Sequence, residues 1–334
     1  MAINGEHFLR LDDPEKQKNL FKLSVRAVEI EVSSYCNRKC WFCPNSKIDR
    51  RTAKNFMDEG VYLRILSELA SIDYDGWISY SGYAEAMADR SFITRVRQAR
   101  AALPRAWIMT CSNGDYLTPE YLEDLADAGI NELYVSAYVD DHQPNWTDDR
   151  ALTALSRFVF RMGLTPNFET VQPGSQYQVK LNHARVTLIV GSRNHLIHAN
   201  DRGNTVDINR PMRTSPCTWV FSNVYIDWDG TVVPCCNVRS DVPEHKDYLI
   251  ANLSSGATIF EAYANSSAVE WRRSMARFGP KANPCTNCYQ GSIPDTPQNR
   301  QVFAVVEDFV KKHEAIEAAV AASKEEERQK AVGG

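Results

Sequence analysis

Residues 29–44, EIEVSSYCNRKCWFCP, contain three closely spaced cysteines: Cys36, Cys40 and Cys43. Three thiolates on one short loop can bind three irons of a cubane [4Fe–4S] cluster, which leaves the fourth iron without a protein ligand. An open coordination position separates a catalytic metal centre from a structural one. Zinc is the alternative, but structural zinc takes four ligands, and His7 is the only histidine before residue 142. The spacing therefore favours a catalytic iron–sulfur site.

The composition of the chain favours a protein of a reducing compartment. The 334 residues carry a net charge of −4, which does not predict a surface for nucleic acid or an anionic membrane. The sequence has no apolar run near the ~20 residues of a membrane span, and its first residues lack the pattern of a signal peptide. Nine cysteines without an export signal are more typical of metal or catalytic sites than of disulfides. We therefore expect a cytoplasmic protein with no membrane or nucleic-acid partner.

Strand and helix patterns alternate through the first 200 residues and must position the cysteine loop. Strands are predicted at 28–33, 77–82, 107–111 and 132–138, helices at 57–71, 91–103 and 151–163, and extended segments near 165–171 and 185–190. Thr118 and Gly129 mark the start and the end of a further helix. About six βα units fit, too few for a closed eightfold barrel, so a doubly wound sheet or an open, partial barrel is predicted. In both folds, working groups lie at the carboxyl ends of the strands, where the cysteine loop falls.

The pattern changes after about residue 210. Residues 224–234, VYIDWDGTVVP, predict two short strands joined by an Asp229-Gly230 turn. A helix is predicted over 259–278 and a charged amphipathic helix over 301–330. We therefore expect an N-terminal extension at 1–26, a barrel at 27–209, a small second domain at 210–295, and a C-terminal helix and tail at 296–334.

The segment CNRKCWFC resembles the CxxxCxxC signature of radical S-adenosylmethionine enzymes. The similarity extends to SGYAEAM at 81–87, SNGDYLT at 112–118, AGINELYVSAY at 128–138 and NDRGN at 200–204. The resemblance implies a partial (β/α)6 barrel in which Cys36, Cys40 and Cys43 hold a [4Fe–4S] cluster whose open iron chelates S-adenosylmethionine. It also implies reductive cleavage of S-adenosylmethionine to a 5′-deoxyadenosyl radical, which abstracts hydrogen from a substrate C–H bond.

The same resemblance assigns residues that bind the cofactor. Glu85 in SGYAEAM matches the acidic residue of the family's GGEP-type segment, which holds the methionine amino group; the second glycine and the proline of that segment are absent here. Phe42 occupies the family's aromatic position, and Ser136 matches a position where relatives place polar groups near the adenosine. The alternatives are a solvated loop carboxylate for Glu85 and an ordinary strand-end hydroxyl for Ser136.

The C-terminal cysteines resemble the SPASM/twitch extension of these enzymes. Cys217 is followed by Gly230 and Cys235 in a Cx₁₂Gx₄C pattern, and Cys285 and Cys288 form a later CxxC pair. The resemblance implies a second, auxiliary [4Fe–4S] cluster ligated by these four cysteines. A complete SPASM domain has more cysteines, so the shorter twitch form fits better. A Cys₄ zinc ribbon is the alternative.

Three further residues receive provisional roles. Cys235 is preferred as ligand over the adjacent Cys236 because of its spacing from Gly230, although the two could be exchanged, and Cys236 is expected to pack behind the cluster. Cys111, at the end of the third strand, could return a hydrogen atom to a substrate radical, as an epimerase requires; an inert buried thiol is the alternative. Arg202, in NDRGN, lies where related enzymes place a substrate-contacting arginine; a surface arginine is the alternative.

The chain as a whole resembles twitch-type dehydrogenases of aminocyclitol biosynthesis. The resemblance implies oxidation of a carbinol in a small aminocyclitol- or sugar-like substrate, with the auxiliary cluster as electron acceptor and a protein such as flavodoxin or ferredoxin as electron donor. The rival functions are a radical epimerase, a maturase that modifies a protein or short peptide, and a non-catalytic iron–sulfur or zinc protein that senses redox state or docks a partner. Only about 27 residues precede the first strand, which favours a small substrate over a leader peptide. Glu85 argues against a sensor, which needs no group to hold methionine.

Overall fold

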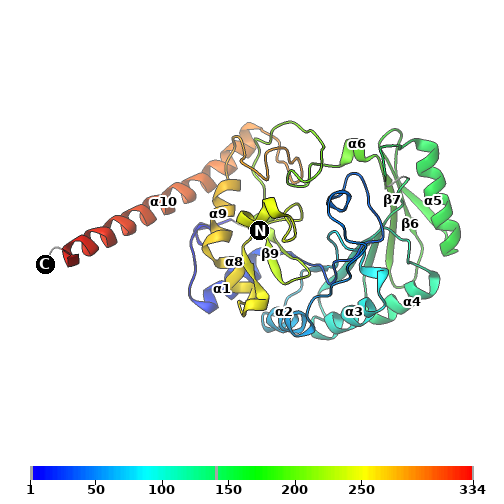
Figure 1. Cartoon of the computed structure of the whole chain (residues 1–334), viewed down its shortest axis with the longest axis horizontal. Helices are drawn as coiled ribbons and strands as arrows, with labels where there is room; N and C mark the ends of the chain where they lie inside the picture. The colour runs from blue at the N-terminus through cyan, green and yellow to red at the C-terminus, as the bar shows by residue number, and fades with distance from the viewer. Residues whose placement is uncertain (1–2, 140–141, 333–334) are drawn as a thin grey trace.

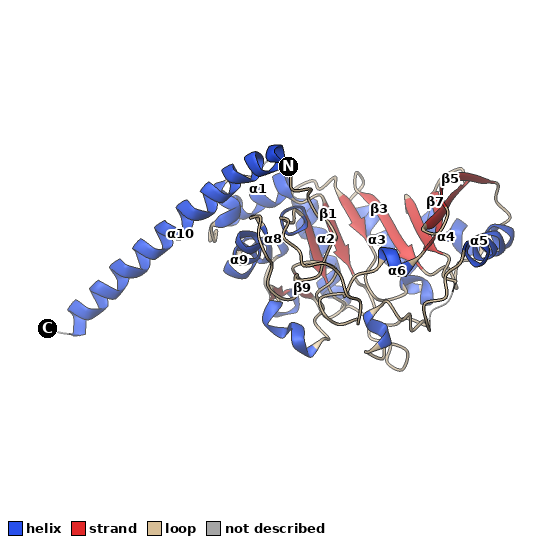
Figure 2. Ribbon diagram, turned by 90° about the horizontal axis from the view of Figure 1, so that it is seen from above, coloured by secondary structure: helices blue, strands red, loops and turns tan. Residues whose placement is uncertain are grey.

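The protein is built around a curved, open sheet (Figures 1 and 2). The structure is a computed structural model that describes residues 3–139 and 142–332. Within the described residues, ten strands join in the order β10-β9-β8-β1-β2-β3-β4-β7-β6-β5. The parallel strands of the barrel are β1 (Ala27–Ile30), β2 (Trp77–Ser79), β3 (Trp107–Ser112), β4 (Glu132–Ser136) and β7 (Thr187–Arg193). Their order runs in one direction, as in a barrel, so the α/β partial barrel is confirmed and the doubly wound alternative is wrong.

Four helices cover the outer face of the sheet: α2 (Glu59–Ser71), α3 (Ser91–Ala102), α4 (Pro119–Ala128) and α5 (Asp148–Met162). The predicted signals act at the ends of α4, because the Thr118 side chain accepts a hydrogen bond from the Tyr121 N–H and Gly129 ends the helix at a φ of 94°. The core between helices and sheet includes Val28 and Ile30 of β1, both fully buried. Since side chains alternate along a strand, Glu29 and Glu31 point to the opposite, concave face.

The expectation that about six βα units precede residue 200 is wrong in its last part. Strands β5 (Pro166–Gln172) and β6 (Gln176–Leu181) form an antiparallel pair, and β6 pairs antiparallel with β7. Only residues 173–175 separate β5 from β6, with Gly174 at a φ of 77°. A parallel crossover needs a dozen or more residues, so this short turn can only return the chain as a hairpin. The first 200 residues therefore supply five parallel strands and an antiparallel hairpin at one edge, and β8 (Asn223–Ile226), which pairs parallel with β1, is the sixth parallel strand among the described residues.

The second half of the chain extends the same sheet. Strands β8 (Asn223–Ile226) and β9 (Thr231–Val233) form the predicted hairpin, β10 (Ala251–Asn252) follows, and β8 pairs parallel with β1. The single helix predicted at 259–278 is instead α8 (Ile259–Ala264) and α9 (Ser266–Met275). Asn265 separates them because it is extended and its side chain accepts a hydrogen bond from the Ala268 N–H, which starts a new helix.

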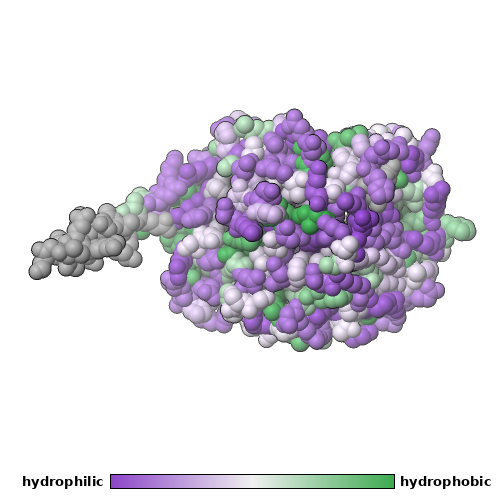
Figure 3. All heavy atoms as spheres, viewed as in Figure 1, coloured by the Kyte–Doolittle hydropathy of each residue, from purple (hydrophilic) through white to green (hydrophobic). Residues whose placement is uncertain are grey.

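The long C-terminal helix α10 (Pro297–Val332) leaves the body of the protein (Figures 1 and 2). Its first turns are anchored by Phe303, Val306 and Val310, which pack with Phe8 and Phe221. The shorter α-helices are α1 (Pro14–Ser24), α6 (His195–His198) and α7 (Trp219–Ser222), and the 3₁₀ helices are η1 (Gly5–Phe8), η2 (Pro44–Ser46), η3 (Ala86–Ala88), η4 (Pro243–Tyr248) and η5 (Leu253–Ser255). Hydrophilic side chains predominate on the face shown in Figure 3. Among the described helices, none has the length and apolar character needed to cross a membrane.

Candidate active site

One cavity of about 250 Å³ lies at the carboxyl ends of the parallel strands. It brings together eight of the sequence-predicted site residues: Cys36, Cys40, Phe42, Cys43, Glu85, Cys111, Ser136 and Arg202. Its other lining residues are Glu29, Arg38, Asn45, Ser81, Gly82, Tyr83, Ala84, Ser112, Asn113, Tyr138 and Cys236. The cavity is therefore shared between the cysteine loop, the strand ends and the second half of the chain.

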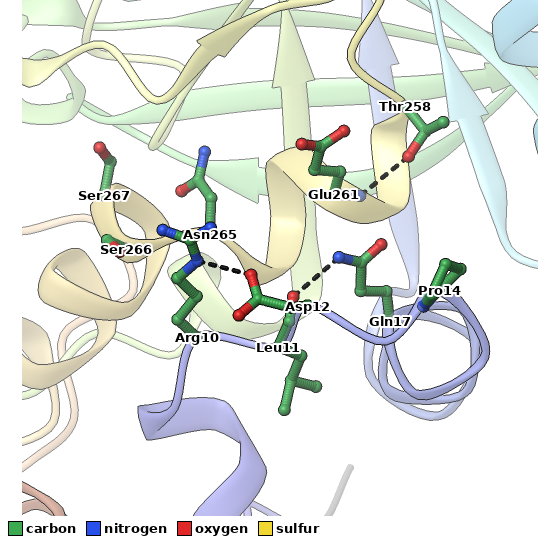
Figure 4. A pocket seen from close by; sticks show the side chains of 10 residues that line it. All are labelled: Arg10, Leu11, Asp12, Pro14, Gln17, Thr258, Glu261, Asn265, Ser266 and Ser267. Atoms are coloured by element: carbon green, nitrogen blue, oxygen red, sulfur yellow. Dashed lines mark hydrogen bonds and ion pairs between the residues drawn. The ribbon is translucent and has the colours of Figure 1, made fainter.

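A larger hollow of about 580 Å³ lies between the N-terminal segment and helices α8 and α9 (Figure 4). Arg10 and Asp12 form an exposed ion pair there, with Nε and Oδ1 2.7 Å apart. All the predicted site residues lie outside its lining. Size alone therefore does not identify the site, and the chemistry of the lining favours the smaller cavity.

The cysteine loop is held by its own backbone and by one buried amide. The Cys36 N–H donates to the Arg50 carbonyl oxygen at 3.1 Å, and the Cys43 N–H donates to the Cys40 carbonyl oxygen at 3.0 Å. The buried Asn45 side chain donates from Nδ2 to the Tyr83 carbonyl oxygen at 2.8 Å. Burial raises the pKa of Cys36 to about 11. A buried thiol becomes a thiolate when a metal supplies the compensating positive charge, so the loop fits an iron site.

Glu85 is nearly completely buried, with 2% of its surface exposed. Its Oε1 accepts from the Ser112 hydroxyl at 2.8 Å and its Oε2 accepts from the Asn113 N–H at 2.8 Å. Burial raises the pKa of Glu85 to about 7, although these hydrogen bonds oppose the shift. Within the described residues, this carboxylate has no ion-pair partner, so a ligand ammonium group would complete it. The solvated-loop alternative for Glu85 does not fit this burial.

An aromatic surface lies beside the cysteine loop. Phe42 stacks on the His195 ring, with centroids 3.5 Å apart and planes at 6°, and its centroid is 5.4 Å from that of Tyr138. Burial lowers the pKa of His195 to about 3, so this imidazole is neutral. Ser136, at the end of β4, lines the same cavity. Flat rings of this kind can stack with a purine. Sequence reasoning selected Phe42 and Ser136 but missed His195 and Tyr138.

The four predicted ligands of the second cluster lie close enough for their thiols to interact, because Cys285 and Cys288 act on the pKa of Cys235 and Cys217 acts on that of Cys285. Cys217 and Cys288 are buried, Cys235 and Cys285 are half-buried, and all of them are free thiols. Burial, followed by the neighbouring thiols, raises the pKa of Cys285 to about 12 and raises that of Cys235. Burial also raises the pKa of Cys288, although a hydrogen bond from the Gln290 backbone and the nearby Arg213 oppose the shift. Among the described residues, no group of three or more His, Cys, Asp or Glu side chains is placed to hold one metal ion. Ligands of a cubane each bind a different iron and stand farther apart.

Nitrogen donors surround these sulfurs. The Asn237 N–H donates to Cys235 Sγ at 3.4 Å. Cys288 Sγ accepts from Asn237 Nδ2 at 3.7 Å, from Asn200 Nδ2 at 3.8 Å and from Arg213 Nη1 at 3.9 Å. Hydrogen bonds of this kind stabilise thiolate and tune the potential of a bound cluster.

Cys235 and Cys236 have different surroundings. The thiols of Cys285 and Cys288 both act on the pKa of Cys235, which lies outside the cavity lining. Cys236 instead lines the cavity, and its thiol donates to Gln290 Oε1 at 3.8 Å. Cys217 and Cys288 also act on the pKa of Cys236, so the packing of Cys236 behind the cluster stays a prediction. These surroundings favour Cys235 as the ligand.

Arg202 also faces the cavity and adopts a φ of 50°. Its Nη1 donates to Asn237 Oδ1 at 3.3 Å, while its Nε is buried without a hydrogen-bond partner. An unpaired buried N–H is unfavourable unless a ligand accepts from it. The surface-arginine alternative is therefore wrong, and a contact with substrate remains a prediction.

Two more groups lie in the lumen of the barrel. The Cys111 side chain is accessible from the hollow lumen of the barrel. The lumen is itself enclosed by protein, and this burial raises the pKa of the thiol to about 11. Glu29 of β1 lines the cavity, and burial, reinforced by Glu31, raises its pKa to about 8. Sequence reasoning missed Glu29. The available signal was a pair of alternating glutamates in a strand that should read as apolar if both faces were packed.

Two protein families match the chain: the radical SAM superfamily over residues 30–142, and the SPASM iron–sulfur cluster-binding domain over residues 217–289. The chain thus contains a radical SAM domain and a SPASM domain. The SAM-dependent 2-deoxy-scyllo-inosamine dehydrogenase of Niallia circulans is 35% identical over 111 residues, which are 33% of this chain and 44% of that protein. The tungsten-containing aldehyde ferredoxin oxidoreductase cofactor-modifying protein of Pyrococcus furiosus is 28% identical over 112 residues, 34% of this chain and 30% of that protein. The matched segments thus span less than half of each relative.

The fold of the chain is similar to that of a solved structure. The crystal structure of BtrN in complex with AdoMet and 2-DOIA aligns with a TM-score of 0.53 at 23% identity, covering 75% of this chain and 87% of that chain. At this identity the likeness supports the fold alone.

The predicted cofactors are confirmed at the level of the domains. A radical SAM domain binds a [4Fe–4S] cluster and S-adenosylmethionine, and a SPASM domain binds further iron–sulfur clusters. The residues present fit both groups, because Glu85 offers a buried carboxylate with no ion-pair partner among the described residues and the second site offers free thiols with N–H donors. The choice of individual ligands and cofactor contacts stays a prediction.

Proposed function

We propose that the protein is an S-adenosylmethionine-dependent dehydrogenase that oxidises a carbinol of a small aminocyclitol- or sugar-like molecule to a ketone. One observation carries the proposal: a single cavity is lined both by the cysteine loop and by Arg202 and Cys236, next to the auxiliary site. A substrate in this cavity would lie between the two metal centres. Such a position suits a reaction that removes a hydrogen atom on one side and an electron on the other.

Residues of the chain orient the cofactor, bind the substrate and accept its hydroxyl proton. When held by Cys36, Cys40, Cys43 and Glu85, S-adenosylmethionine and its cluster would supply the radical that takes the hydrogen atom, and a cluster held by the C-terminal cysteines would provide an acceptor for the remaining electron. Glu85 orients the cofactor through its amino group. The unpaired Nε–H of Arg202 binds the carbinol oxygen, and Glu29 accepts the hydroxyl proton. The substrate thus loses one hydrogen atom, one proton and one electron, and its C–O single bond becomes a double bond.

The named relatives support this substrate class. The Niallia circulans protein is a 2-deoxy-scyllo-inosamine dehydrogenase, and BtrN was crystallised with AdoMet and 2-DOIA. An electron donor of the flavodoxin or ferredoxin type is included in the proposal because cofactor cleavage consumes one electron per turnover. Nine free cysteines further suit a reducing compartment, and we place the protein in the cytoplasm.

The direct test is turnover of 2-deoxy-scyllo-inosamine by anaerobically reconstituted protein with S-adenosylmethionine and a one-electron reductant. We expect 5′-deoxyadenosine and a ketone lighter than the substrate by two hydrogens, in equal amounts. Deuterium placed on the carbinol carbon should appear in 5′-deoxyadenosine. A product of unchanged mass that gains deuterium from heavy water would instead indicate an epimerase, with Cys111 as hydrogen donor.

A further inference from the structure

A chain of buried ion pairs joins the barrel to the SPASM domain. Arg50, 3% exposed, follows the cysteine loop and donates from Nη1 to Oε1 of Glu31 at 2.7 Å. Its Nη2 donates to Oδ2 of Asp241 at 2.9 Å. Arg239, 1% exposed, donates to the same carboxylate from Nε at 2.7 Å and from Nη2 at 2.6 Å. Arg50 and Asp241 lie 191 residues apart in sequence, and the ion pairs connect the segment after the cysteine loop, the end of β1 and the loop after Cys236.

Glu31 also supports the segment that carries Glu85. Its Oε1 accepts the Tyr83 N–H at 2.7 Å and the Ala84 N–H at 2.8 Å, in addition to Arg50. Gly82 makes this approach possible, because its φ is 129° and a Cβ there would lie 2.9 Å from Glu31 Oε1. The segment from Gly82 to Glu85 therefore rests on one buried carboxylate of the barrel.

Tyr83 holds the same segment from the other side. Its hydroxyl donates to the Cys236 carbonyl oxygen at 2.6 Å. Its ring lies under the Arg239 guanidinium, with 4.2 Å between Cζ and the ring centroid. With Glu85 in the acidic position of the GGEP-type segment, Ala84 stands where that segment has its second glycine, and Tyr83 stands one position before it. Tyr83 thus connects the cofactor-binding segment to the second domain through its hydroxyl and its ring.

We propose that Tyr83, together with the Glu31–Arg50–Asp241 ion pairs, locks the cofactor-binding segment to the SPASM domain and thereby sets the spacing of the two metal centres. The proposal goes beyond the dehydrogenase function and does not depend on the substrate. Removing Asp241 would take the countercharge from the buried Arg239 guanidinium and leave Arg50 with Glu31 alone. Removing Glu31 would leave Arg50 paired with Asp241 but would take the acceptor from the Tyr83 and Ala84 N–H groups.

The test compares Tyr83→Phe with Tyr263→Phe in the reconstituted full-length protein. Tyr83→Phe removes the hydroxyl bond to Cys236 but keeps the ring against Arg239. Tyr263 is the matched control, because its buried hydroxyl donates to the Phe221 carbonyl oxygen at the same distance of 2.6 Å. Both reduced clusters are paramagnetic, so the splitting of their electron paramagnetic resonance spectrum measures the interaction between them.

We expect Tyr83→Phe to alter this splitting, to speed amide exchange at residues 83–85 by about tenfold, and to raise the ratio of 5′-deoxyadenosine to product. Tyr263→Phe should leave all three unchanged. Glu31→Gln provides a second variant, expected to speed the same amides, and its far-ultraviolet circular dichroism checks that it folds. Unchanged splitting in folded Tyr83→Phe would overturn the proposal, even with faster exchange, because the segment would then not set the spacing of the metal centres.

Discussion

The backbone N–H of Asn113 donates a 2.8 Å hydrogen bond to Oε2 of Glu85. Because Asn113 directly follows β3 and Glu85 follows β2, two neighbouring strand ends fix one buried carboxylate. The oxygen atoms face a cavity that also contains the cysteine loop. The sheet thus places an anion where the amino group of a cluster-bound cofactor would need one.

Replacing Glu85 with Gln should weaken S-adenosylmethionine binding without affecting cluster assembly. The expected loss is about 10²-fold in affinity, because a buried charged partner of the ammonium group is removed. Equilibrium binding to reconstituted protein measures the affinity, and iron analysis checks the cluster. Glu120→Gln, at an exposed position in the first turn of α4, is the control. Equal affinities for wild type and Glu85→Gln would contradict the assigned role.

The cysteine loop makes a separate prediction. Cys36→Ala, Cys40→Ala and Cys43→Ala should each abolish 5′-deoxyadenosine formation, because a cluster with an incomplete ligand set does not bind the cofactor productively. Chromatographic detection of 5′-deoxyadenosine after reduction measures this. Normal cleavage in any of the three variants would rule out the radical assignment of the loop.

Local patterns in the sequence predicted much of this fold. Thr118 and Gly129 gave the bounds of α4, and Asp229-Gly230 gave the hairpin of the second domain, because capping and turn chemistry depend on adjacent residues. The β5–β6 hairpin was missed although Pro173-Gly174 is a turn signal, since a regular βα repeat was assumed there.

The candidate site was predictable only where it follows motifs. Glu85 and the loop cysteines stand in recognisable segments, whereas Arg50 and Asp241 meet across 191 residues and carry no local pattern. The alternation of side chains along β1 placed Glu29 on one face of the strand but did not reveal that this face lines a cavity. The exposed side of a strand depends on which elements cover it, and a single sequence does not contain that information.

The iron content of variants tests whether Cys235 or Cys236 is a ligand of the auxiliary cluster. Cys217→Ala, Cys235→Ala and Cys288→Ala should each lower the iron per chain from roughly 8 to roughly 4, the content of one [4Fe–4S] cluster. S-adenosylmethionine cleavage should persist while ketone formation is lost. Cys236→Ser should retain the higher iron content, because its side chain faces the cavity. The opposite result for the adjacent pair would exchange their roles, and one zinc with roughly 4 iron would remove the electron acceptor.

The raised pKa of Glu29 predicts how ketone formation depends on pH. A base must be ionised to accept the hydroxyl proton, and the burial that raises the pKa of Glu29 to about 8 leaves it mostly protonated below that pH. The rate of ketone formation should therefore rise about tenfold per pH unit below 8 and level off above it. Glu29→Gln should lower the rate by about 10² or more and remove this rise. Cleavage of S-adenosylmethionine without substrate, measured over the same pH range, serves as the control because it does not involve the hydroxyl proton. A pH profile for ketone formation that is identical in wild type and Glu29→Gln would assign the proton to another group.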